Sequence, residues 1–128
     1  KNPRVVAVLD WELSTLGHPY ADLAYQCMQL RLPSDIAHAA GLGGLDREQL
    51  GIPSEQEYIN AYCERRGIDS ISNWTFYLAF SFFRLAAILQ GVVKRAHDGN
   101  ASSEKAIQLG AMVRPLAQIA NQTIHQSE

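Results

Sequence analysis

The strongest constraint on the fold is an apolar run from Tyr77 to Val93, which carries a single charged residue, Arg84, near its centre. A helix of this length could almost span a bilayer, but a central arginine costs about 2.5–3.5 kcal/mol on membrane-insertion scales. We therefore expect a helix that is buried on most sides within a soluble domain, and no membrane partner. A buried guanidinium needs a partner, so an ion pair for Arg84 is favoured over an anion-binding role.

Composition supports a soluble domain and excludes several functional classes. The 128 residues are 47% hydrophobic and 19% charged, as in one ordinary globular domain. The net charge of −2, with both signs interspersed, leaves no basic footprint for nucleic acid. Cys27 and Cys63 are too few and too far apart for a disulfide scaffold or a zinc ribbon. Because the first residues have no signal-peptide pattern, we expect a cytoplasmic protein.

Local start and stop signals divide most of the chain into helices. Pro19 favours a helix start and Pro33 a stop, while Ser54 with Glu57 forms a capping box. The expected helices cover about residues 19–32, 55–66 and 74–97, with Asn73 as the cap of the third, and a last helix is capped by Ser102 or Ser103. An extra turn is possible at 46–50. Pro115 interrupts the last apolar face, where we expect a kink rather than an end. The glycine-rich stretch at 41–44 lacks a phosphate-loop ending and is interpreted as a mobile connection.

The segment Arg4–Trp11 is the only part with the character of a strand. It is short, apolar and β-branched, which suits a buried strand over Val5–Leu9. A lone strand leaves its backbone groups unpaired, so its partners must lie outside this chain or in another molecule. The expected fold is therefore mainly α, with one short N-terminal strand followed by four to five helices. The exposed strand edge predicts self-association.

Two acidic residues at the end of that strand are candidate metal ligands. Alternation along a strand places Asp10 and Glu12 on one face, where their oxygens could share Mg²⁺ or Mn²⁺. A pair of solvated acids is the alternative. His18 and Asp22 lie four residues apart at a helix start, but neither a metal site nor a triad with Ser14 is favoured. We expect His18 to cap the turn and Asp22 to accept backbone N–H groups.

A basic cluster ends the long helix. Lys94, Arg95 and His97 lie together there, and a solvated surface explains them better than a binding site.

The segment from residue 8 to residue 25, VLDWELSTLGHPYADLAY, resembles the metal-binding segment of the aminoglycoside phosphotransferase and choline kinase-like family. It is most similar to the kinase-like domains associated with acyl-CoA dehydrogenase family members ten and eleven. The resemblance continues through PSEQEY at 53–58, FYLAFSFFRLAAI at 76–88 and GNASS at 99–103. It covers most of the chain, and the first segment is the specific one.

The resemblance implies a protein-kinase-like fold that transfers phosphate from ATP, with Mg²⁺, to a hydroxyl group of a small molecule. It makes Asp10 the metal-binding aspartate, lets Glu12 assist, and makes Asp22 a structural brace for the catalytic loop. The helices that follow form the acceptor-side wall, for which Tyr77 and Arg84 are the candidates. An acyl-CoA dehydrogenase-associated branch favours a hydroxyacyl-CoA or related hydroxy acid as acceptor.

The chain departs from the family pattern in what it lacks. It has no match to the nucleotide loop, the phosphate-binding lysine or the loop that carries the catalytic base, all of which precede Asp10 in the family. Residues 1–128 are therefore expected to be the C-terminal subdomain of the kinase-like domain, with no catalytic residue of its own and no turnover in isolation. The alternative is a non-catalytic helical module for binding or oligomerisation.

Overall fold

The computed structural model describes residues 4–34, 41–100 and 105–125, and those residues are mainly helical. Five α-helices occur in this part of the chain, together with two short 3₁₀ turns. In chain order they are η1 (Trp11–Leu13), α1 (Pro19–Arg31), α2 (Glu55–Arg66), α3 (Trp74–His97), α4 (Lys105–Gln108), η2 (Leu109–Met112) and α5 (Val113–His125). The described residues contain no strand, and Pro33 and Gly43 form one isolated parallel bridge.

Capping chemistry explains the ends of α1 and α2, as the sequence predicts. Pro19 is the first residue of α1, and the side chain of His18 accepts a hydrogen bond from the Tyr20 amide. Helix α2 begins with the complete capping box of Ser54 and Glu57. It ends at Gly67, whose φ of 64° is the left-handed conformation that glycine adopts without a steric penalty.

Helix α3 begins and ends where predicted, but the side chain of Asn73 does not cap it as expected. Asn73 has a left-handed backbone (φ 56°) and makes no side-chain cap hydrogen bond. Its carbonyl oxygen instead accepts from the amides of Phe76 and Tyr77. At the other end, Lys94 pairs with Asp98 at 2.7 Å on the surface. The solvated interpretation of this basic end is therefore confirmed for Lys94.

The predicted kink near Pro115 takes the form of a 3₁₀ interruption. Proline has no N–H for the carbonyl four residues back, and its ring crowds that turn. The chain accordingly tightens into η2, and α5 begins at Val113, two residues before Pro115. Gly110 in η2 also permits a close approach to α3, because a Cβ there would lie 2.9 Å from Cγ2 of Val93. The predicted caps Ser102 and Ser103 lie outside the described residues.

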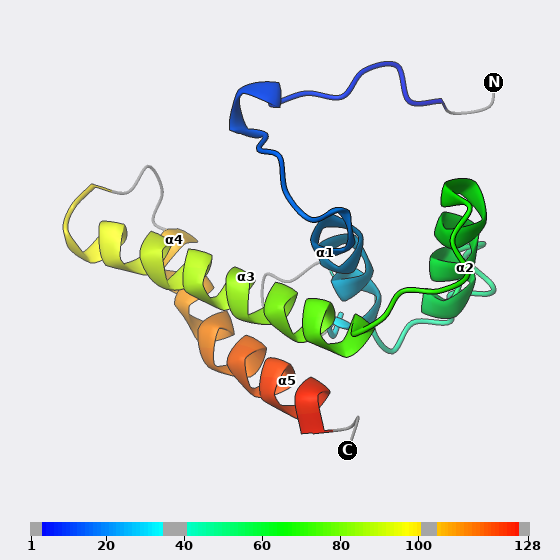
Figure 1. Ribbon diagram of the computed structural model, residues 1–128. Coiled ribbons are helices and arrows are strands. Elements are labelled where there is room, and N and C mark those ends of the chain that lie inside the picture. The colour runs from blue at the N-terminus through cyan, green and yellow to red at the C-terminus, as the bar shows by residue number, and fades with distance from the viewer. Residues whose placement is uncertain (1–3, 35–40, 101–104, 126–128) are drawn as a thin grey trace.

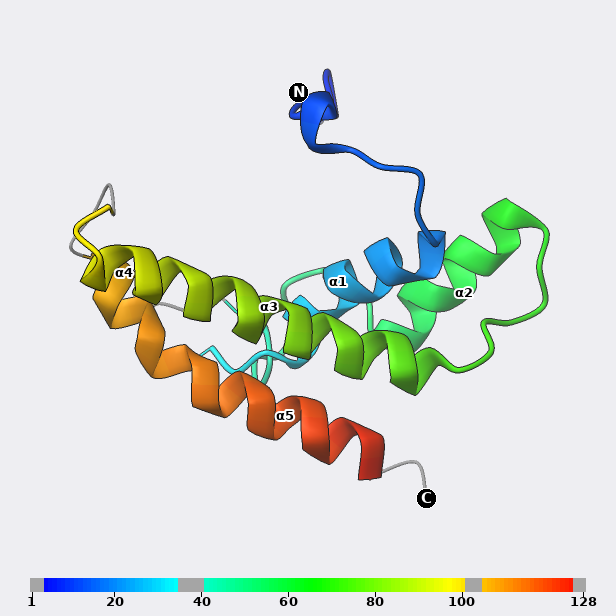
Figure 2. The ribbon, with the colours of Figure 1, turned by 60° about the vertical axis from the view of Figure 1, so that its left-hand side comes forward.

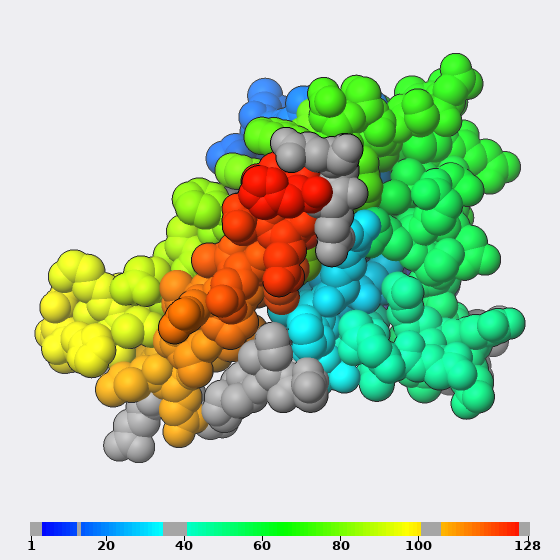
Figure 3. Space-filling model, turned by 90° about the horizontal axis from the view of Figure 1, so that it is seen from below, coloured from blue at the N-terminus to red at the C-terminus, as the bar shows by residue number. Residues whose placement is uncertain are grey.

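The core forms where α3 packs between α1 and α5. Figures 1 and 2 both show α5 running antiparallel along α3, and Figure 3 shows α5 covering the lower face. The buried apolar residues of this cluster come from α1 and its C-terminal end, α3, η2 and α5. They are Met28, Leu32, Leu78, Phe82, Ala86, Leu89, Met112, Leu116 and Ala120.

Burial of α3 is one-sided, which corrects the expectation of a helix buried on most sides. Only 28% of its most apolar 18-residue window is buried, and Phe76, Phe80 and Phe83 are exposed. By length and composition alone, α3 could cross a membrane. Helices α1 and α5 cover only part of α3, and the described chain has no further helix to cover the rest of its surface.

The glycine-rich stretch is hydrogen-bonded to the end of α1 where it is described, and its mobility stays a prediction. The amides of Leu42 and Gly43 donate to the carbonyl oxygens of Gln29 and Leu32, both at 2.9 Å. A Cβ on Gly41 would lie 1.9 Å from the Leu32 oxygen, so the backbone contact requires glycine. These glycines therefore pack the loop onto the end of α1.

The predicted N-terminal strand is wrong within this chain. Residues 4–10 are irregular and leave the helical body above α1 as an arm (Figure 1). Val5 is 85% exposed and Leu9 is 78% exposed. A strand requires a hydrogen-bonding neighbour, and the described residues offer none. The residues prefer a strand, but a strand forms only where a second segment pairs with it.

Candidate metal and acceptor site

Asp10 lies at the end of the arm and has an unusual backbone. Its φ of 62° and ψ of 34° are left-handed, a conformation that aspartate tolerates better than most residues but that still carries strain. The η1 turn follows directly, and the Ser14 hydroxyl closes it by donating to the Trp11 carbonyl at 2.6 Å. The strand alternation used to place Asp10 and Glu12 on one face therefore does not apply, because Glu12 lies within a 3₁₀ turn.

The two carboxylates are nevertheless available for a cation. Asp10 and Glu12 are both exposed, and neither carries a hydrogen bond or ion pair among the described residues. Mg²⁺ takes oxygen ligands and is usually held by one or two carboxylates together with waters and substrate phosphates. No group of three or more His, Cys, Asp and Glu residues that could hold a metal occurs in the described ranges. The donor set fits a magnesium ion shared with a phosphate ligand rather than an all-protein cage.

Behind the arm, the first turn of α1 meets α3 through an aromatic cluster. The Tyr77 hydroxyl lies 3.3 Å from Nε2 of His18, and the two rings are 5.1 Å apart. Tyr20 packs edge-on against Tyr77 at 5.8 Å and against Tyr62 of α2 at 6.4 Å. We call these four residues the α1 junction. It brings the predicted wall residue Tyr77 next to the segment that carries the acids.

The other two predicted residues lie at different places. Asp22 is exposed in the first turn of α1, where the helix dipole stabilises its negative charge. Its side chain makes no hydrogen bond among the described residues. Its role as a brace stays a prediction. Arg84 is exposed, and its guanidinium lies 5.1 Å from the centre of the Tyr25 ring. The expected ion pair is wrong, because exposure to water removes the need for one.

Sequence reasoning missed the polar contact that joins α1, α2 and the start of α3. Arg31 donates from Nε and Nη2 to the two carboxylate oxygens of Glu55, both at 2.6 Å. Trp74 Nε1 also donates to Glu55 at 3.0 Å. The three residues are 19 or more positions apart in pairs, so no local spacing signals the contact. We call them the Glu55 network.

The Glu55 network shifts the pKa values of Glu55 and of the nearby Cys27. Burial alone would raise the pKa of Glu55, but the hydrogen bonds from Arg31 and Trp74 hold it below its ordinary value. Burial, and then the negative charge of Glu55, raises the pKa of the nearby Cys27 thiol to about 11. Cys27 is therefore a protonated core thiol and an unsuitable nucleophile.

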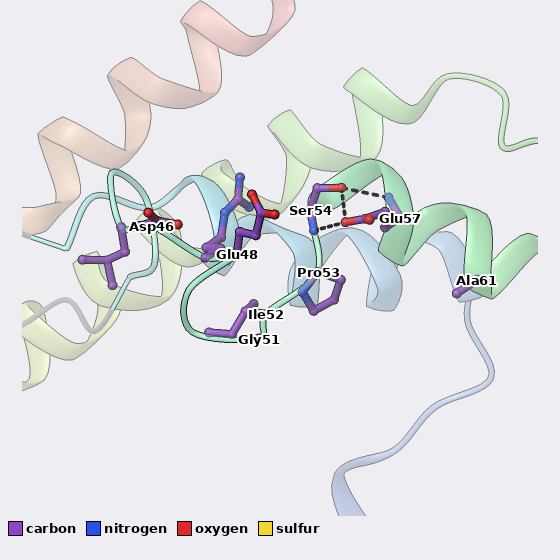
Figure 4. Close-up of a pocket in the computed structure, with 10 residues that line it drawn as sticks. Asp46, Glu48, Gly51, Ile52, Pro53, Ser54, Glu57 and Ala61 are labelled. Carbon is purple, nitrogen blue, oxygen red and sulfur yellow. Dashed lines mark hydrogen bonds between the residues drawn. The ribbon is translucent and has the colours of Figure 1, made fainter.

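A broad depression on the described surface lies away from the predicted site residues. It measures about 850 Å³ and lies between residues 45–53 and the start of α2 (Figure 4). Three of its polar side chains make local hydrogen bonds: Ser54 donates to Glu57 from N–H and hydroxyl at 2.8 and 2.7 Å, and Asp46 accepts from the Gln49 amide. None of the predicted site residues lines it.

The sequence that carries these residues is similar to known proteins. Residues 1–58, which include Asp10, Glu12 and Asp22, match the model of the phosphotransferase enzyme family. The chain is 53% identical over 116 residues to acyl-CoA dehydrogenase family member 10 of Mus musculus, an overlap of 91% of this chain and 11% of that protein. It is 47% identical over 119 residues to acyl-CoA dehydrogenase family member 11 of Rattus norvegicus, which covers 92% of this chain and 15% of that protein.

A solved structure extends the similarity to the fold. A crystal structure from Ralstonia eutropha, provisionally described as an aminoglycoside phosphotransferase, aligns with a TM-score of 0.88 at 47% identity. The alignment covers 98% of this chain and 37% of that chain. The chain thus spans about a tenth to a seventh of its curated relatives and about a third of this solved chain. The first 58 residues thus match the phosphotransferase enzyme family, and the chain as a whole is similar to a mainly helical part of that solved phosphotransferase-like chain.

Proposed function

We propose that the longer protein containing this chain transfers a phosphoryl group from ATP to a hydroxyl group of a small molecule. The supporting observation is Asp10, an exposed carboxylate without a partner among the described residues, held in a left-handed backbone within the segment that matches the phosphotransferase family. In phosphoryl transfer the protein supplies positioning and charge stabilisation rather than covalent chemistry. An exposed carboxylate directly before a defined turn is suited to that task.

Each residue has a distinct role in this proposal. Asp10 holds the magnesium ion, and Glu12, two residues on, assists with a further carboxylate. A bound Mg²⁺ supplies positive charge that offsets the negative charge of the ATP phosphates. Asp22 acts on α1 as a brace for the loop that carries the catalytic base. That base is expected outside this chain, so the isolated chain is expected to have no turnover.

The acceptor is proposed to be a hydroxyacyl-CoA or a related hydroxy acid. The names of the relatives, acyl-CoA dehydrogenase family members 10 and 11, favour an acyl substrate in the same protein. The exposed face of α3 is aromatic and has no carboxylate cluster of the kind a polycationic aminoglycoside would need. Arg84, which has no carboxylate partner within the described ranges, is proposed to receive an anionic group of the acceptor, and Tyr77 to line the same wall.

A second candidate function is a non-catalytic helical module that associates with itself or with another protein. The observation that favours it is the arm, where Val5, Val6, Val8 and Leu9 are all exposed. An unpaired apolar arm can pair with another chain. Sedimentation of the isolated chain decides this candidate, since a monomer at high micromolar concentration contradicts it.

The phosphotransferase proposal is tested by Asp10→Asn in the complete protein. Asparagine also tolerates the left-handed backbone, so the turn should persist while the negative charge is lost. We expect kcat with ATP–Mg²⁺ and a hydroxyacyl-CoA to fall at least about 100-fold, with an unchanged melting temperature. Glu64→Gln, which neutralises an exposed acid of α2, is the matched control and should leave both quantities unchanged.

The result that contradicts the proposal is equally specific. Full activity of Asp10→Asn across a range of Mg²⁺ concentrations would remove Asp10 from the metal. A panel containing hydroxyacyl-CoAs, free hydroxy acids and aminoglycosides separates the acceptor from the reaction type. Turnover of aminoglycosides alone would retain the phosphotransferase and reject the acyl acceptor. The isolated chain serves as the blank in every assay.

A further inference from the structure

His18 uses both of its ring nitrogens at the point where the arm enters the helical body. Nδ1 accepts from the Tyr20 amide at 3.4 Å and thereby caps α1. Nε2 lies 3.3 Å from the Tyr77 hydroxyl of α3. The two contacts belong to different elements, so one side chain joins the start of α1 to α3.

The cap decides which tautomer the ring adopts. A nitrogen that accepts a backbone N–H carries no proton, so a neutral His18 must carry its proton on Nε2. The Nε2–H then donates to the Tyr77 oxygen. The ring is therefore held at both nitrogens, and the capping contact and the contact with α3 favour the same tautomer.

Packing around the ring reinforces this arrangement. The His18 ring lies 4.8 Å from the ring of Tyr20 and 5.1 Å from that of Tyr77, with Tyr20 also packed edge-on against Tyr77. Preceding residues such as Leu9, Trp11 and Leu16 are exposed. In Figure 2 the arm rises from the start of α1 and lies away from the other helices. The α1 junction is thus where the arm first engages them.

We propose that His18 is a positioning residue, whose contact with Tyr77 fixes the direction in which the Asp10–Glu12 segment leaves α1. This inference rests on the proposed function, in which Asp10 and Glu12 must face the magnesium ion. Gly17 offers no side chain to restrain the chain before His18, and Pro19 restrains only the helical side. The His18–Tyr77 contact therefore fixes the position on the helical body from which the arm departs.

Two variants remove this contact and leave the cap intact. In His18→Asn the amide oxygen can still accept from the Tyr20 amide, as asparagine does at helix N-caps, but it cannot reach Tyr77. Tyr77→Phe removes the hydroxyl and keeps the ring. Each should lower the melting temperature of this chain by about 2–5 °C, and the double variant should be no less stable than either single one. Additive losses would overturn the inference.

Nitrogen-15 NMR of the His18 ring reports its tautomer, which a side chain that only fills space would not fix. The expected spectrum shows an unprotonated Nδ1 and a protonated Nε2 in one fixed tautomer. A ring that averages between tautomers, or one protonated on Nδ1, would overturn the inference. His18→Ala removes the cap as well and should destabilise the chain more than His18→Asn.

Kinetics of the complete protein test the positioning role. Both His18→Asn and Tyr77→Phe should lower kcat by the same factor, about 5- to 10-fold, with the acceptor KM within about 2-fold of the original. A rise in acceptor KM in Tyr77→Phe alone would make Tyr77 a substrate contact and refute positioning, as would unchanged rates in both. If the unmodified protein has no turnover, the proposed function fails, whereas the NMR and melting experiments still decide the contact.

Discussion

Replacing Glu55 by glutamine tests the contact that joins three helices. The glutamine oxygen can still accept one hydrogen bond, from Arg31 or Trp74, but the charge and the paired geometry are lost. Hydrogen bonds to charged groups contribute about 1.5–3 kcal/mol when buried, and exposed ion pairs less than about 1 kcal/mol. The Glu55 side chain is 16% exposed and that of Arg31 is 41% exposed, so the pair lies between these limits. We expect Glu55→Gln to cost about 1–2 kcal/mol.

The dependence on pH follows from the lowered pKa of Glu55. Its carboxyl has a lower pKa in the folded chain than the ordinary 4.5, so the ionised form is stabilised by folding. This contribution is fully present above about pH 4.5 and is lost as the pH falls through the folded-state pKa. The stability difference between the original chain and Glu55→Gln should therefore be constant near neutrality and shrink under acid conditions.

Thermal melts from pH 7 down to pH 3 measure this difference. For a chain of this size about 1–2 kcal/mol corresponds to a fall of roughly 3–8 °C at pH 7. Glu64→Gln on the exposed face of α2 controls for the loss of a negative charge and should shift the melt by less than about 2 °C. A Glu55→Gln loss that persists unchanged at pH 3, or that equals the control at pH 7, would refute the reasoning.

Two further predictions concern the core. Phe82 is completely buried, and Phe82→Ala should cost about 3–5 kcal/mol in chemical denaturation, whereas Phe83→Ala on the exposed face should cost less than about 1 kcal/mol; equal costs would contradict the assigned packing face. Because the pKa of Cys27 is raised to about 11, its alkylation at pH 8 should be at least about 100-fold slower in the folded chain than after unfolding. Mass mapping of the modified peptide checks this, and rapid labelling of folded chain at Cys27 would contradict it.

The helix boundaries were predictable because capping is local. Pro19, the Ser54–Glu57 box and Gly67 act on backbone groups within three or four residues, and the structure has helices that begin and end there. The metal candidates Asp10 and Glu12 were also identified from a short segment that resembles a known family. Their conformation was not, because the strand argument assumed a partner that the described residues do not contain.

Errors arose wherever a residue's environment depends on distant neighbours. The apolar run at 77–93 predicted a helix but not which of its faces would be covered, so Arg84 was expected to be buried and is exposed. The glycines at 41–44 make backbone contacts with the end of α1 that their small size permits and that the local sequence did not indicate. Periodicity reports that a face is apolar and says nothing about the number of neighbours available to cover it.

By itself, then, the sequence determined the helical segments of this protein, and it predicted Asp10 and Glu12 as metal ligands, since both inferences depend on contiguous residues. Only the tertiary structure decided that Glu55 binds Arg31 and Trp74, and that His18 lies against Tyr77, 59 positions away. Such contacts depend on the relative rotation and offset of packed helices. Those quantities are set by the core between α1, α3 and α5, in which many small apolar contacts act together and no single local pattern specifies the result.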